Sequence, residues 1–306
     1  MIGAIIGDIV GSVYEFDNHR SKVFPFFNSR GRLTDDSILT LAIADALVEC
    51  ADRGSFGEIK TIAVERMRAI GKQYMASGYG GRFKRWLNSS DPRPYGSYGN
   101  GAAMRVSAIV VAAPNLETAK IWTRMVTEVT HNHPEGIKGA LATVELAWLA
   151  KEARKNAEGK SKDAILKVAR QYYPEKDFMG GFNLDAIRPT YRFNESCQET
   201  VPQAIESFLE ARNFEDAIRN AISIGGDSDT LAAITGTIAE AFYGVPIERR
   251  NKALSYFDSL QYKVYSGFVD VFGDLPLFGE LPGEIAFLQS EDGALGGIST
   301  MGDVIE

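Results

Sequence analysis

Apolar residues recur at intervals of three and four along most of this 306-residue chain. From Asp36 onward, for example, Ile38, Leu39, Ala42 and Ile43 fall on one face of a helix. The same periodicity is found in further segments, at residues 56–75, 102–112, 116–129, 135–155, 161–172, 200–211, 214–223, 229–243 and 248–265. Alternating apolar and polar runs bounded by turn dipeptides are scarce, so the sequence predicts an all-α fold.

The breaks between these segments are rich in Gly, Pro, Ser and Asn, and the longest, at 76–101 and 173–196, are predicted to be functional loops. Neither an internal repeat nor an interdomain linker is visible, which favours a single compact domain over residues 1–306. Within it, residues 251–306 are expected to form a C-terminal helix and a Gly-rich tail. That tail, from Phe278 to Glu306, is the least predictable segment.

Charge and cysteine content exclude several classes of protein. With 33 basic and 40 acidic residues the formal net charge is -7, which argues against a general nucleic-acid or anionic-membrane surface. Cys50 and Cys197 do not make a disulfide framework, so a cytoplasmic location is expected. The start of the chain lacks the basic flank of a signal peptide, and a run of the ~20 apolar residues that a membrane span requires is absent. The chain has three histidines, His19, His131 and His133, which are few for a zinc site with imidazole ligands.

Two short segments concentrate oxygen ligands at predicted helix starts. They are Thr34-Asp35-Asp36-Ser37 and Gly225-Gly226-Asp227-Ser228-Asp229-Thr230. Each segment alone is typical of a helix cap, because Thr and Asp favour that position and acids complement the helix dipole. Each nevertheless carries a second carboxylate and a hydroxyl beyond what capping uses. Four carboxylates match the charge of two Mg2+ or Mn2+ ions, which prefer all-oxygen ligands.

The first predicted helix has glycine at every fourth position, at Gly3, Gly7 and Gly11, which leaves a bare stripe along one face. Asp8 and Glu15 lie seven residues apart and share a neighbouring face. The spacing alone favours tight helix packing on the glycines with solvated acids. The alternative is that Glu15 serves a site as a general base.

A Gly-rich loop, Tyr95 to Arg105, runs into a predicted helix. Its amides could cradle a phosphate or a ribose, although such a loop is more often a tight turn. It contains neither a P-loop nor a dinucleotide fingerprint. His131 and His133, two residues apart before Pro134, cannot share one helical face, and hydrogen bonding within a loop is the simpler interpretation.

Taken together and in order, six segments between about residues 1 and 250 resemble the signatures of the ADP-ribosylglycohydrolases. They are Gly7-Asp8-Ile9-Val10-Gly11-Ser12-Val13-Tyr14-Glu15-Phe16, Thr34-Asp35-Asp36-Ser37, Gly99-Asn100-Gly101-Ala102-Ala103-Met104-Arg105, Thr130-His131, Val201-Pro202-Gln203-Ala204-Ile205 and Gly226-Asp227-Ser228-Asp229-Thr230. The family is all-α, which agrees with the periodicity. Ser37 departs from the Thr that many members have at that position.

The resemblance implies a role for each of these positions. Two Mg2+ or Mn2+ ions would be held by Thr34, Asp35, Asp36, Asp227, Asp229 and Thr230. Glu15 would be the acid/base near the scissile bond, with the carboxylates of Asp36 and Asp229 assisting. Substrate would be bound by Ser97, Tyr98, Gly99, Asn100, Gly101, Met104 and His131.

The implied reaction is hydrolysis of the bond between C1 of a terminal ribose and its acceptor, through an oxocarbenium-like transition state. The substrate would be an ADP-ribosylated protein or a small ADP-ribose derivative. In this family the acceptor is recognised by variable loops, which here are residues 17–33, 76–95 and 173–196. The resemblance therefore does not decide between arginine-linked, serine-linked, polymeric and free ADP-ribose derivatives. A mono-ADP-ribosyl substrate is slightly favoured. A two-metal phosphoester hydrolase and a non-catalytic ADP-ribose binder are the alternatives.

Overall fold

Helix α12 (Ser228–Tyr243) runs through the centre of the molecule, and all of its residues except the last are buried. The computed structural model describes residues 1–155, 161–275 and 277–278. A helix that is apolar on every side needs neighbours all round. Four helices supply them: α1 (Ile2–Gly11), α7 (Pro134–Lys155), α10 (Cys197–Leu209) and α11 (Phe214–Ser223).

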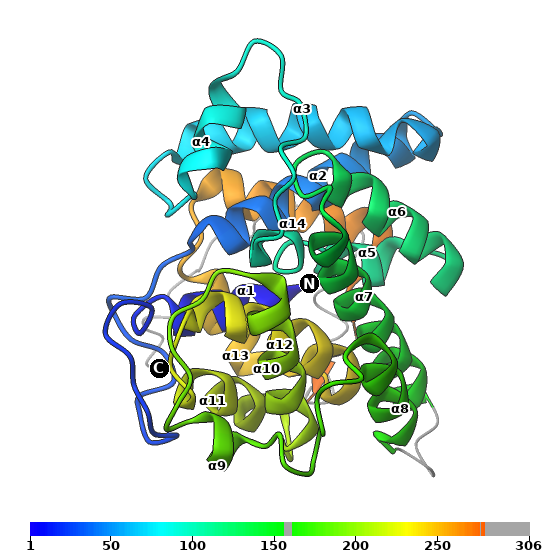
Figure 1. The fold of residues 1–306 in the computed structure, drawn as a ribbon. Helices are drawn as coiled ribbons and strands as arrows, with labels where there is room; N and C mark the ends of the chain where they lie inside the picture. Colours follow the sequence, from blue (N-terminus) through cyan, green and yellow to red (C-terminus); the bar gives the residue numbers. More distant parts are fainter. Residues whose placement is uncertain (156–160, 276, 279–306) are drawn as a thin grey trace, which may run out of the picture.

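Helix α2 (Asp35–Asp52) begins beside α1 and forms the second buried element of the core. It packs against α3 (Ile59–Gly71), α5 (Ser107–Ala112) and α14 (Ser259–Phe272), while α6 (Leu116–Glu128) lies between α3 and α7. In Figure 1 the helices α2, α3 and α14 form the upper part of the molecule, and α1 and α10 to α12 form the lower part. The start of α2 therefore meets α1 where the two parts join.

The remaining elements are short and peripheral. They are α4 (Gly81–Asn88), α8 (Asp163–Tyr172), α9 (Leu184–Ile187), α13 (Ile247–Leu254), 3-10 turns at Phe56–Glu58, Lys72–Tyr74 and Asn100–Ala102, and the strands β1 (Val245–Pro246) and β2 (Leu277–Phe278). The two strands form one parallel pair. Within the described ranges, none of the helices has the length and apolar character needed to cross a membrane.

The all-α prediction is confirmed, with several corrections to the elements. The helix expected at 248–265 is two helices, because Asp258 accepts hydrogen bonds from the amides of Leu260 and Gln261 and starts a new helix there. The predicted loops 76–101 and 173–196 contain α4 and α9. The helix expected at 102–112 begins only at Ser107. Most of the predicted Gly-rich tail, residues 279–306, lies outside the described residues.

The glycine stripe of α1 lies directly on the backbone of α12. A methyl group added to Gly7 would lie 2.1 Å from the carbonyl oxygen of Ala232, and one added to Gly11 would lie 2.5 Å from that of Ser228. The tight-packing interpretation of these glycines is therefore confirmed. The expectation of solvated acids is wrong for Asp8, which is completely buried.

We expect Gly7→Ala to destabilise the protein by about 2–4 kcal/mol, because the new methyl group must push two helix backbones apart. Denaturant unfolding measures this loss. Gly267→Ala is the matched control, since Gly267 is also helical but has no atom within 4 Å of an added methyl group. That change should leave stability unchanged or raise it by up to about 1 kcal/mol. Equal stability of the two variants would contradict the role assigned to the stripe.

Candidate active site

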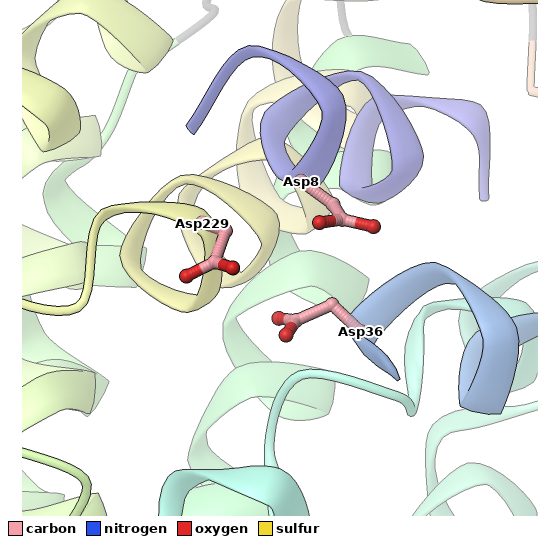
Figure 2. Close-up of side chains that lie close together, drawn as sticks. All are labelled: Asp8, Asp36 and Asp229. Atoms are coloured by element: carbon pink, nitrogen blue, oxygen red, sulfur yellow. The ribbon is translucent and has the colours of Figure 1, made fainter. Parts of the chain in front are cut away.

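Carboxylates from three helices converge at one buried point. Asp8 lies on α1, Asp36 in the first turn of α2 and Asp229 in the first turn of α12. One oxygen atom of each lies within 4.8 Å of the others, and Figure 2 shows the three side chains pointing toward one another. The two predicted clusters of oxygen ligands thus meet in space, and α1 adds a third acid to them.

Asp8 was not predicted to belong to this group. It accepts hydrogen bonds from the amide of Thr34 at 2.9 Å, the hydroxyl of Thr34 at 2.6 Å and the amide of Ser37 at 3.1 Å. These donors include free backbone amides at the start of α2, where negative charge is favoured. Asp8 therefore fixes the start of α2, and with it the position of Asp36.

A second group of acids adjoins the first. Glu15, Asp227 and Asp229 each contribute an oxygen atom within 4.8 Å of the others, so Asp229 belongs to both groups. The turn before α12 is made by Gly225 and Gly226, whose φ angles of 73° and 80° are accessible to glycine. The predicted Gly-Gly turn is confirmed, and it brings Asp227 and Asp229 to one centre.

The other predicted ligands lie beside these groups. Asp35 is not a member of either, but it lines the adjoining cavity. The hydroxyl of Thr230 donates to Asp36 at 3.1 Å, as that of Thr34 does to Asp8. A hydroxyl that donates its proton keeps lone pairs free for a cation. The assignment of these three residues as ligands stays a prediction.

Burial and mutual repulsion perturb the acids strongly. Burial, followed by the charge of Asp229, raises the pKa of Asp8 to about 7 and the pKa values of Glu15 and Asp35 to about 8. The same causes raise the pKa of Asp36 well above its usual value. Oxygen Oδ1 of Asp36 is buried and has no hydrogen-bond partner among the described residues.

The acids of the two groups lack a salt bridge to any basic side chain that the structure describes. Within the described parts of the chain, Lys and Arg side chains form no ion pair with these carboxylates. Buried carboxylates at this density are unfavourable unless they are protonated or neutralised by a cation. The arrangement therefore fits a binding site for hard divalent cations, for which carboxylate and hydroxyl oxygens are suitable ligands.

A cavity of about 230 Å³ opens next to the acids. One wall carries Glu15, Asp35, Asp36, Asp227, Asp229 and Thr230, and six of the seven predicted substrate-binding residues also line it: Ser97, Gly99, Asn100, Gly101, Met104 and His131. Tyr98 does not line it: this side chain is 48% exposed and its ring lies 5.2 Å from that of His133. Arg82, Tyr95 and Glu195 line the cavity without having been predicted.

Asn100 joins the Gly-rich loop to the acids. Its side-chain amide donates to Oδ2 of Asp227 at 2.6 Å and to the hydroxyl of Thr200 at 3.2 Å. Its backbone amide donates to the carbonyl oxygen of Glu195 at 2.7 Å. The loop and the carboxylates are thus held in one fixed arrangement around the cavity.

His131 stands behind the Gly-rich loop as a neutral imidazole. Burial, followed by the nearby charge of Arg105, lowers its pKa well below the usual value. Its Nδ1 lies 2.7 Å from the hydroxyl of Thr130, which accepts a hydrogen bond from Arg105. That hydroxyl can donate only to Nδ1, which favours the tautomer with its proton on Nε2, near Gly101.

The chain is similar to known proteins over most of its length. The sequence profile described as ADP-ribosylglycohydrolase matches residues 1–260. The chain is 26% identical to the ADP-ribosylhydrolase ARH3 of Homo sapiens, over 80% of this chain and 84% of that protein. It is also 26% identical to the ADP-ribosylarginine hydrolase Tri1 of Pseudomonas putida (strain GB-1), over 80% and 70%. A solved ADP-ribosylglycohydrolase-related protein complex has the same fold, with a TM-score of 0.62 and 22% identity over 89% of this chain and 94% of that one.

We expect Asp36→Asn to stabilise the cation-free protein, increasingly so as the pH rises. Four of the acids, Asp8, Glu15, Asp35 and Asp36, have raised pKa values, so the folded state binds more protons than the unfolded state between about pH 4 and pH 8. Their contribution to the free energy of unfolding is consequently lost as the pH rises through that range. Removing one charge should raise the free energy of unfolding by about 1–3 kcal/mol at pH 8 in EDTA, as measured by denaturant unfolding.

Asp270→Asn is the control, because it removes the same charge from an exposed position on α14. It should change stability by less than about 0.5 kcal/mol at either pH. If Asp36→Asn were instead less stable than the unmodified protein at pH 8, the acids would be structural rather than a strained cation site.

Proposed function

This chain belongs to the ADP-ribosylglycohydrolase family, and from that membership we propose that it hydrolyses the glycosidic bond between ADP-ribose and an acceptor. The observation that supports this most is that the buried acids and the Gly-rich loop face one cavity. The acids suit the ribose end of the ligand and the loop amides suit its diphosphate. A phosphoester hydrolase would not need a ribose and diphosphate site of this kind.

The acids fit two Mg2+ or Mn2+ ions. The donors are all oxygen atoms, they form two overlapping groups, and Oδ1 of Asp36 has no hydrogen-bond partner in the described part of the chain. Asp36, Asp227 and Asp229 would be the central ligands, with Thr34, Asp35 and Thr230 as predicted from the sequence. When bound, such ions supply Lewis acidity and hold the ribose hydroxyls and a water molecule.

The protein's own groups position the substrate and move protons. Asn100, held by Asp227 and Thr200, fixes the loop that would contact the diphosphate. Neutral His131 directs the Nε2 proton toward the same loop. Glu15 lines the cavity and is the most exposed member of its group, so it is the acid that can reach the departing atom of the acceptor and donate a proton to it.

The acceptor is proposed to be an arginine or serine side chain carrying a single ADP-ribosyl group. One of the relatives is named as an ADP-ribosylarginine hydrolase. The acceptor side of the cavity has acids close at hand, including Glu15 and Glu195. Such a wall suits a guanidinium group at least as well as a neutral hydroxyl.

We expect the purified protein to release ADP-ribose from arginine- or serine-linked substrates when Mg2+ or Mn2+ is present. This release should cease when EDTA removes the ions. Glu15→Gln should lower kcat about 100- to 10,000-fold, because it removes the proton donor while preserving shape. Product release followed by chromatography measures both effects. Glu58→Gln, at a surface position 58% exposed and remote from the cavity, is the matched control and should keep full activity.

Three other assay results would contradict part of this proposal. Release of inorganic phosphate in place of ADP-ribose would identify a phosphoester hydrolase. Calorimetric binding of ADP-ribose without turnover of any acceptor linkage would identify a binding protein. Turnover unaffected by EDTA would refute the two-ion site while leaving the glycosidic reaction in place.

A further inference from the structure

A second hollow adjoins the cavity, and none of the buried acids of the site lines it. Its volume is about 290 Å³, and Arg82 and Tyr95 line both hollows. The cavity of about 230 Å³ lies below the ~300–1,000 Å³ typical of small-molecule sites. A ligand the size of ADP-ribose therefore has to extend beyond this cavity, and Arg82 and Tyr95 border one adjoining space that could receive it. We call this second hollow the arginine groove.

The arginine groove is positively charged in a chain whose formal net charge is -7. It is lined by three arginines, Arg82, Arg85 and Arg93, and by a single acid, Asp91. Arg85 is exposed, and its guanidinium makes no hydrogen bond or ion pair with the part of the chain that the structure describes. Arg93 pairs with Asp91 at 2.6 Å, but the two side chains are 81% and 65% exposed, so this pair contributes little.

The backbone that borders the groove is also restrained. Arg93 stands between Pro92 and Pro94, and proline fixes its own φ angle and restricts the residue before it. The loop is anchored by Arg68, which donates to the carbonyl oxygens of Leu87 and Ser89. Arg85 and Arg93 line the same hollow, and a guanidinium group favours phosphate, which it can bind through two parallel hydrogen bonds.

We propose that the arginine groove binds a phosphate group on the adenosine ribose of the substrate, additional to the two phosphates of ADP-ribose. This inference rests on the proposed function, which places the scissile C1 at the acids and the diphosphate at the Gly-rich loop. The adenosine then lies beyond the loop, toward Arg82 and Tyr95, and its ribose hydroxyls face Arg85 and Arg93. The preferred substrates would be derivatives of ADP-ribose phosphorylated at the adenosine 2′- or 3′-hydroxyl.

The test compares three ligands by calorimetry: ADP-ribose, and ADP-ribose phosphorylated at the adenosine 2′ or the 3′ position. One phosphorylated form should bind the unmodified protein about 10- to 100-fold more tightly than ADP-ribose. The gain should shrink as salt is added. Arg85→Gln and Arg93→Gln should each remove most of the gain while leaving ADP-ribose binding within about twofold. The identity of the tighter isomer names the position of the phosphate.

Arg250→Gln is the control, since Arg250 lines neither hollow and, among the described residues, its guanidinium donates hydrogen bonds to the side chain of its neighbour Asn251. The inference is overturned if neither isomer binds more tightly than ADP-ribose. It is also overturned if Arg85→Gln weakens all three ligands equally, because the groove would then serve the diphosphate itself. Failure of ADP-ribose to bind at all would instead refute the proposed function, so the two failures are distinguishable.

Discussion

The contact between the backbones of α1 and α12 is the constraint on which the rest of this structure depends. It forms because Gly3, Gly7 and Gly11 leave no side chain between the two helices. The contact brings Asp8 beside Asp229, and Asp8 in turn holds the first turn of α2 through the backbone of Thr34. Three helices that are distant in sequence therefore present their acids to one point because of a stripe of missing side chains.

The acids at this point are held against their own repulsion. Hydrogen bonds from Thr34, Thr230 and Asn100 satisfy part of their negative charge. The repulsion that remains between the carboxylates is offset by the packing of the large apolar core around α12, so the protein can fold with a locally unfavourable site. The same burial that makes the carboxylates unfavourable gives them their altered proton affinity, which is typical of functional sites.

Much of the fold and part of the site could be predicted from the sequence, and the misses have physical reasons. Periodicity found the long helices, but α4 has only eight residues, which is shorter than the window in which a period can be recognised. The oxygen-rich helix starts were visible as local motifs. Asp8 was missed because spacing within one helix says nothing about the helix it faces. Tyr98 lies within the predicted loop, yet alternate residues of an extended segment point in opposite directions, so it turns away from the cavity.

The sequence separation of α1 and α12 also determines when, during synthesis, the core of the protein can fold. The backbone amide of Gly3 bonds to Glu240, a partner 237 residues further along the chain. On the ribosome, α1 is made early and cannot bury its apolar surface until nearly all of the described chain has followed. Contacts of such long range form slowly and leave exposed apolar segments in the meantime. The carboxylate site of this chain is therefore assembled late in biosynthesis, and its first helix keeps its apolar surface exposed until α12 has been made.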